Sequence, residues 1–426
     1  MHLSALTWNR YRSFKERQRV ELAPITIIIG KNGSGKSVIS RLPLLLASGI
    51  QGETHDPLDL VAGGIEHAAA YQDLINMRSA LTFSLGAEIS EEGRQYGFET
   101  TMRYVNETRS LAIEAFRISH GETDVVRADI ADVAQLTKAS PDYIVRAFGE
   151  DLQPQPMAFS GLFPQLSYFH GVMRSQLSNI MELFRTALPQ PSYLGPFRAE
   201  PGTLTRSPGQ VVQTLGPRGE RSIEMLADDK LRHNGSVGDA VSQWFTDTLG
   251  QRIAIDTNSS RPQLLVTDHA GSMDVSLADT GAGFAQVLPI CVQNFAYRAG
   301  RIKTPMLIVE QPELHLHPAA HGNVADLFVE TAMPGQNWRS PTCIVETHSE
   351  QLIMRIRRRI AEGFEPERVV LWSLNHRDSF EEKEATPVRV IAFDTDGSPQ
   401  AWPAGVFEET LRDLSGLRHA ARERGL

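Results

Sequence analysis

The chain has 426 residues, of which 41% are hydrophobic and 22% charged, and its formal net charge is −9. This length allows one large or two modest domains, and the composition is ordinary for a globular protein. The negative charge argues against a surface that coats nucleic acid nonspecifically, although it leaves a local basic groove open. Residues 42–50, the longest strongly apolar stretch, are too few to span a membrane, and the N-terminus lacks a signal-peptide core, so we expect a cytoplasmic protein with no membrane partner.

The first chemically informative feature in chain order is a glycine-rich turn. Residues 25–29 form an apolar, β-branched run typical of a buried parallel strand. A helix is expected from about Lys36, and Pro43 should end or kink it early. Between strand and helix the sequence matches the phosphate-binding P-loop G-x-x-x-x-G-K-[ST] at every fixed position. The matching residues are Gly30, Lys31, Asn32, Gly33, Ser34, Gly35, Lys36 and Ser37.

This P-loop predicts a site for ATP and Mg²⁺. Its glycines let consecutive backbone N–H groups turn toward phosphate oxygens, and the following helix adds the positive end of its dipole. Lys36 is expected to bridge the β- and γ-phosphates, and the Ser37 hydroxyl to bind Mg²⁺. A chance glycine-rich turn is the alternative, and the flanking strand and helix argue against it.

The middle of the chain has a different pattern from its two ends. Antiparallel hairpins are predicted for residues 81–89, 98–105 and 111–119, and again for 263–267 and 274–277. Residues 130–188 look more helical, with proline-containing breaks. From about Gly281 the α/β pattern returns, with strands expected at 306–309, 342–345 and 369–374 and helices at 319–333 and 349–362.

One α/β nucleotide-binding domain built from both ends of the chain is therefore expected. Its halves are residues 1–80, with the P-loop, and 279–376. Residues 81–278 are expected to form a mixed β-rich and helical insertion, and 377–426 a short C-terminal domain. The strand at 306–309 ends in Glu310, which is the layout of a Walker B motif whose acid orients the Mg²⁺ shell.

In their order along the chain, these motifs resemble those of ABC-type P-loop ATPases of the SMC, RecF and OLD-like group. Residues 311–318 resemble the D-E-P-E-x-H-L-H-P run of that group, and residues 11–15 its N-F-[KR]-S-F segment. The resemblance implies that Arg12 lies beside the nucleotide base and that His348 is the switch histidine sensing the γ-phosphate. The implied fold is an α/β head with an insertion between Walker A and Walker B.

Residues 279–284 stand where these ATPases carry the ABC signature loop. By resemblance, Asp279, Gly281 and Gly283 bind the nucleotide of a facing subunit, so the implied assembly is an ATP-dependent homodimer or higher oligomer. Further segments resemble landmarks of one subfamily, whose members have a short C-terminal domain of unknown function and are often found among bacterial antiviral systems. These segments are residues 193–198, 216–220, 279–289, 394–397 and 402–407. That resemblance implies a co-encoded effector protein as partner.

Two departures from the family pattern bear on hydrolysis. The Walker B acid is Glu310 rather than Asp, and Gln311 holds the position of the usual catalytic glutamate. A glutamine can orient a water molecule but cannot accept its proton. Glu313 is the nearest spare carboxylate in sequence, and it is either the base or a structural partner in the turn. We therefore expect slow hydrolysis.

Several other patterns favour structural interpretations. His315 and His317 fit the loop after Walker B better than a separate metal site. Residues 355–359 form a basic helix that is interpreted as a solvated face, with nucleic acid contact as the alternative. Asp394 and Asp396 fit a turn better than a nuclease centre.

Three functions fit this sequence. The first is an ATP-driven switch that gates a partner protein, in a bacterial antiviral system. The second is a DNA repair or chromosome-maintenance clamp of the RecF kind, which would bind DNA with strong salt dependence. The third is an ATP-locked scaffold with negligible hydrolysis.

Overall fold

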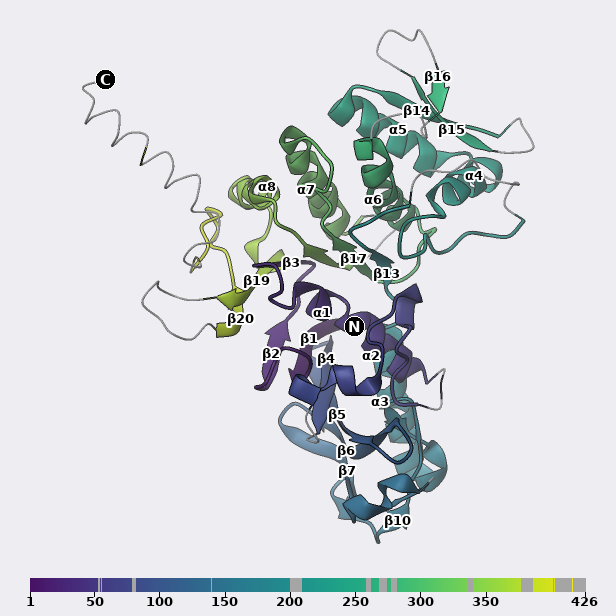
Figure 1. Cartoon of the computed structure of the whole chain (residues 1–426), viewed down its shortest axis with the longest axis vertical. Helices are drawn as coiled ribbons and strands as arrows, with labels where there is room; N and C mark the ends of the chain where they lie inside the picture. Colours follow the sequence, from purple (N-terminus) through teal and green to yellow (C-terminus); the bar gives the residue numbers. More distant parts are fainter. Residues whose placement is uncertain are drawn as a thin grey trace.

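The computed structural model describes residues 1–52, 54, 56–78, 82–138, 140–199, 209–257, 262–267, 274–276, 282–335, 340–376, 386–400, 402 and 416. Among these residues, the centre of the molecule is a six-stranded sheet in the order β13-β17-β18-β3-β19-β20 (Figure 1). β20 runs antiparallel to β19, and the other neighbours are parallel. The strands are β3 (Ile25–Gly30), β13 (Ser192–Leu194), β17 (Met306–Glu310), β18 (Thr342–Glu346), β19 (Val369–His376) and β20 (Thr386–Ile391).

Side chains of the central sheet alternate between two buried faces, which explains why its strands are almost continuously apolar. On β3, Ile25, Ile27 and Ile29 pack with the helices of one face, whereas Ile28 packs on the opposite face. The first face is covered by α6 (Ala282–Arg298), α7 (Pro318–Ala332) and α8 (Glu350–Ala361). The second is covered by α1 (Lys36–Ser40), α2 (Leu42–Gln51) and α3 (Gly171–Ala187).

The helix after the P-loop breaks where the sequence predicted. α1 ends at Ser40, and α2 starts at Leu42 with Pro43 in its first turn. Proline is compatible with that position because the first N–H groups of a helix have no intrahelical acceptor. The break leaves Arg41 between the helices, and its side chain takes part in the site described below.

A second, antiparallel sheet lies below the central sheet in Figure 1, and among the described residues it has nine strands. Eight follow the order β10-β8-β7-β6-β5-β4-β1-β2, and β9 pairs with β8. Its strands are β1 (His2–Asn9), β2 (Gln18–Glu21), β4 (Phe83–Glu91), β5 (Arg94–Val105), β6 (Ser110–His120), β7 (Thr123–Ile130), β8 (Asp142–Ala147), β9 (Glu150–Asp151) and β10 (Gln155–Pro156). The hairpins predicted between residues 81 and 119 are confirmed as β4, β5 and β6.

The helical interpretation of residues 130–188 is wrong for most of that segment. β8, β9, β10, β11 (Phe159–Ser160) and β12 (Phe163–Pro164) precede α3, which begins only at Gly171. The missed signal in β8 is a period of two, since Tyr143 and Val145 are buried while Ile144 is 57% exposed.

A third group of elements lies beside α6, at the upper right of Figure 1. It contains α4 (Ser222–Arg232), α5 (Ser236–Leu249), β14 (Arg252–Asp256), β15 (Gln263–Thr267) and β16 (Asp274–Ser276). β15 and β16 pair antiparallel, which confirms the predicted hairpin, while its turn at 269–271 lies outside the described residues. β13, within segment 81–278, instead pairs with β17 in the central sheet.

Short 3₁₀ helices connect these elements: η1 (Ala62–Gly64), η2 (Tyr71–Leu74), η3 (Asn76–Arg78), η4 (Val133–Thr137), η5 (Leu166–Tyr168) and η7 (Pro366–Arg368). Across the described residues, no helix has both the length and the apolar character that crossing a bilayer requires. Most of 377–426, the expected C-terminal domain, lies outside the described residues.

Candidate nucleotide-binding site

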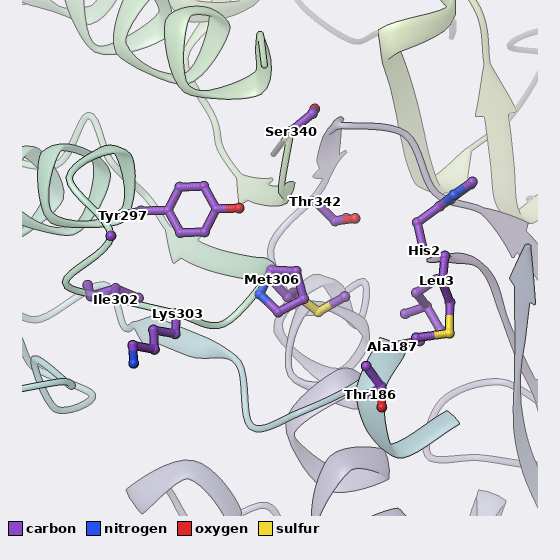
Figure 2. Close-up of a pocket in the computed structure, with 13 residues that line it drawn as sticks. His2, Leu3, Thr186, Ala187, Tyr297, Ile302, Lys303, Met306, Ser340 and Thr342 are labelled. Atoms are coloured by element: carbon purple, nitrogen blue, oxygen red, sulfur yellow. The ribbon is translucent and has the colours of Figure 1, made fainter. Parts of the chain in front are cut away.

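Cavities lie at both ends of the central sheet. One of about 380 Å³ is at the amino ends of β17 and β18, where Tyr297, Met306 and Thr342 line it (Figure 2). The other, of about 770 Å³, is at the carboxyl ends and is lined by the P-loop. Ligands of open α/β sheets bind at the carboxyl ends of the strands. The second cavity, called the P-loop cavity here, is therefore the candidate site.

The structure brings most of the predicted nucleotide-binding residues together around the P-loop cavity. Its lining includes Arg12, Asn32, Gly33, Gly35, Lys36, Ser37, Gln311 and His348, all of which the sequence singled out. Asp73, Arg78 and Glu346 line it as well, without having been predicted as site residues. Arg12 is fixed at the rim because its guanidinium donates hydrogen bonds to the backbone oxygens of His67 and Asp73.

Backbone geometry in the P-loop requires glycine at position 35. Gly35 has φ +95° at the start of α1, a conformation that side-chain-bearing residues rarely adopt. A Cβ there would also lie 2.8 Å from Ser13 Oγ. The loop can therefore pass close to the segment around Arg12 only with glycine at this position.

Lys36 lies folded over the P-loop. Its Nζ donates to the backbone oxygens of Gly30 and Lys31, each at 2.9 Å, and the residue is only 5% exposed. Burial lowers the pKa of Lys36, and the nearby Glu346 partly offsets this effect. The ammonium is thus held above the loop where the phosphates of a nucleotide would lie.

Glu310, the Walker B acid, is bound to protein groups and does not line the P-loop cavity. Arg41 donates to both of its oxygens, from Nε at 2.7 Å and from Nη2 at 2.6 Å. Ser40 Oγ donates a third hydrogen bond, at 2.8 Å. With 1% exposure, Glu310 is an acid whose charge is neutralised inside the protein.

Glu346 lies beside Glu310 and does line the cavity. The two residues are register partners at the carboxyl ends of β17 and β18. Ser37 Oγ donates to Glu346 Oε1 at 3.2 Å, and burial together with the charge of Glu310 raises the pKa of Glu346 to about 7. The sequence signal was a lone acid ending an apolar strand directly before Thr347 and His348.

Gln311 is held in the cavity wall by a buried arginine. Its backbone has φ +46°, its N–H donates to the Glu346 carbonyl at 2.7 Å, and its own carbonyl accepts from Arg198 at 3.1 Å. Arg198 also donates to the Glu310 carbonyl at 2.7 Å, and burial lowers its pKa to about 10. Arg198 therefore fixes the turn that directs Gln311 toward the cavity, a role that sequence reasoning missed.

Glu313 contacts the loop that follows β18. Its Oε2 accepts from Thr347 Oγ at 2.8 Å, and its Oε1 accepts from the His348 N–H at 2.7 Å. Unlike Gln311, it is not a lining residue of the P-loop cavity. Desolvation and the charge of Lys36 lower the pKa of His348, which favours the neutral imidazole. These contacts favour the interpretation of Glu313 as a brace, here for the loop that carries His348.

Replacing Glu313 with Gln tests whether it is a base or a brace. We expect a lower melting temperature and a single-turnover hydrolysis rate within tenfold of the parent, because one charge-assisted hydrogen bond, worth about 1.5–3 kcal/mol, is weakened. A general base would instead make the rate fall by roughly 10²–10⁴ at an unchanged melting temperature. In the companion variant Gln311→Glu, which restores a carboxylate at a lining position, we expect a higher rate.

The signature-like loop is described only in part. Asp279 and Gly281 lie outside the described residues, whereas Gly283 is in the first turn of α6. A Cβ on Gly283 would lie 2.8 Å from the His315 carbonyl, so α6 starts directly against the loop after β17. None of the described residues of α6 lines the P-loop cavity.

The remaining patterns have structural partners. In the basic helix α8, Arg355 and Arg359 pair with Asp326, and Arg358 pairs with Glu362. His317 Nδ1 accepts from the Ala319 N–H at the start of α7. In the turn after β20, Asp396 accepts a hydrogen bond from the Ser398 N–H. These contacts fit a paired helix face, a helix cap and a turn.

A P-loop between a buried parallel strand and a helix, with acids at the ends of the neighbouring strands, defines the class of P-loop nucleotide-binding ATPases. The family model described as "AAA domain, putative AbiEii toxin, Type IV TA system" matches residues 25–355, and the chain belongs to this family. Family membership confirms the predicted class, whose members generally bind ATP with Mg²⁺.

Among solved structures, the SMC head domain from Thermotoga maritima matches with 11% identity and a TM-score of 0.42, over 92% of this chain and 100% of that chain. No curated protein matches this chain in sequence.

Proposed function

We propose that the protein is a cytoplasmic ATP-binding and ATP-hydrolysing switch that forms a nucleotide-sandwich dimer and gates a partner protein. The observation that carries the proposal is the composition of the P-loop cavity. Its walls contain groups suited to phosphate and Mg²⁺, namely Lys36, Ser37 and Glu346. In the described part of the signature-like segment, Gly283 lies instead against the loop after β17, and it does not line the cavity. The resemblance implies that this segment completes the site of a facing subunit, and the position of Gly283 outside its own P-loop cavity supports that arrangement.

The family description mentions a putative toxin of a type IV toxin–antitoxin system. This supports a role in bacterial defence, where the dimer would act on a co-encoded effector. The carboxylate of Glu313 already accepts hydrogen bonds from Thr347 and His348, and position 311 holds a glutamine, which cannot accept a proton. Both features support slow hydrolysis, so that ATP-bound dimers would be long-lived. The same features favour the second candidate, an ATP-locked scaffold. A single-turnover hydrolysis rate indistinguishable from that of ATP alone would select the scaffold.

ATP-dependent association is the central test of the sandwich model. With a non-hydrolysable ATP analogue and Mg²⁺, we expect light scattering to show a doubling of mass or a larger oligomer, because bound nucleotide would bridge two P-loop cavities. Lys36→Ala, measured with the same analogue, is the control and should keep the nucleotide-free mass. If the parent protein binds the analogue with no change in mass, the sandwich model is wrong.

A further inference from the structure

Two acids end neighbouring strands of the central sheet, on the same face. Glu310 of β17 and Glu346 of β18 are register partners, and Ser40 Oγ lies between them, 2.8 Å from Glu310 Oε1 and 3.4 Å from Glu346 Oε2. Alternation along each strand turns them toward α1, the helix that starts with Lys36 and Ser37. Either position could therefore supply the carboxylate that a P-loop ATPase needs for Mg²⁺.

The environment of Glu310 leaves it little capacity for a metal. Arg41 makes a two-pronged contact with both carboxylate oxygens, the strongest type of arginine–carboxylate geometry, and Ser40 adds a third donor. The side chain of Glu310 is 1% exposed, and that of Arg41 is 29% exposed. Three donors already occupy most of the acceptor sites of the carboxylate, so direct binding of Mg²⁺ by Glu310 would compete with a largely buried ion pair, whose loss is costly because it leaves one charge unpaired.

The environment of Glu346 is suited to Mg²⁺. Its Oε1 lies 3.2 Å from Ser37 Oγ, the hydroxyl that the P-loop motif assigns to the metal, and Glu346 and Ser37 both line the cavity. Hydroxyl and carboxylate oxygens are hard ligands of the kind that Mg²⁺ prefers. The positive groups around Glu346 are the neighbouring Lys36 and Arg41, and the guanidinium of Arg41 is already bound to Glu310.

We propose that Glu346, and not the Walker B residue Glu310, is the carboxylate that holds the Mg²⁺ of a bound nucleotide together with Ser37. Glu310 and Arg41 then form a structural ion pair behind the site. This inference rests on the proposed ATP-binding function and deepens it, because it moves the metal-binding acid from one strand to the next.

The test measures metal binding directly rather than turnover. Mn²⁺ is titrated into protein with a saturating non-hydrolysable ATP analogue, and free Mn²⁺ is followed by electron paramagnetic resonance. We expect Glu346→Gln to weaken protein-dependent Mn²⁺ binding by roughly 10–100-fold, the range for groups that support a metal site. Affinity for the analogue in EDTA, measured by calorimetry, should fall less than threefold, because Lys36 and the loop N–H groups remain.

Glu99→Gln is the matched control. Glu99 also accepts a serine hydroxyl, from Ser84 at 2.7 Å, and pairs with Arg17, but it belongs to the antiparallel sheet and does not line the P-loop cavity. Both Mn²⁺ binding and analogue affinity should match the parent. Glu310→Gln should melt at a lower temperature and still bind Mn²⁺ more tightly than Glu346→Gln does.

The outcomes distinguish this inference from the proposed function. If Glu346→Gln binds Mn²⁺ with the affinity of the parent protein, the assignment to Glu346 is overturned. It is also overturned if Mn²⁺ binding is lost only in Glu310→Gln while that variant remains folded. A parent protein that does not bind the analogue in EDTA or with Mg²⁺ overturns the proposed function itself. Should Glu346→Gln fail to fold, Glu346→Asp, which keeps the charge on a shorter side chain, replaces it. Unchanged Mn²⁺ binding by that variant also overturns the inference.

Discussion

Replacing Lys36 with Ala should abolish measurable ATP binding while leaving the fold intact. A hydrogen bond to a charged group contributes about 1.5–3 kcal/mol, so losing contacts to two phosphates weakens binding by roughly 10²-fold or more. The fold should persist, because the partners of Lys36 Nζ are two backbone oxygens of the loop itself, Gly30 O and Lys31 O. Calorimetric titration with ATP, alongside thermal unfolding, measures both quantities.

Lys303→Ala provides the matched control for this experiment. Lys303 lines the cavity at the amino ends of the strands, at the other end of the central sheet (Figure 2). The same change of side chain there should leave ATP affinity at the parental value. An affinity that falls for Lys303→Ala and stays unchanged for Lys36→Ala would move the nucleotide site to the other cavity and remove the P-loop assignment.

Features encoded by short, local spacing could be predicted from the sequence. The P-loop, Arg12, Gln311 and His348 meet at one cavity because each follows a strand of the central sheet or adjoins the loop after one. Strong apolar runs identified β3, β17 and β18 correctly, because a strand buried on both faces has few positions that face solvent. A motif needs only its own few residues to be recognised.

Features that depend on how strands pair could not be predicted in this way. Arg41 meets Glu310, 269 residues apart, only because β17 and β18 lie in register beside β3. Arg198 depends in the same way on β13, whose three residues are too few to show a pattern. The roles of Glu310 and Glu346 therefore follow from tertiary contacts, whereas the family motif fixes only their order in the chain.

Arg41→Ala should destabilise the protein more than a typical surface substitution. The variant would leave Glu310, which is 1% exposed, without its cation. Removing one partner of a buried pair costs about 3–5 kcal/mol, and we expect the lower end because the Arg41 side chain is 29% exposed. Arg103→Ala is the control, since Arg103 pairs with Glu114 at 2.6 Å with side-chain exposures of 30% and 23%. Thermal unfolding of both variants tests the contribution of burial.

For the control variant Arg103→Ala we expect the free energy of unfolding to fall by about 1 kcal/mol or less, because the partner left behind in a more exposed pair is better solvated. If the two variants lose the same free energy of unfolding, Glu310 is not isolated from water. The double replacement of Arg41 by Met and Glu310 by Leu should recover most of the lost stability, since apolar side chains of similar volume often replace a buried ion pair without cost. If that double variant still binds Mn²⁺ with nucleotide, the Arg41–Glu310 pair supports the fold and Glu346 supports the metal.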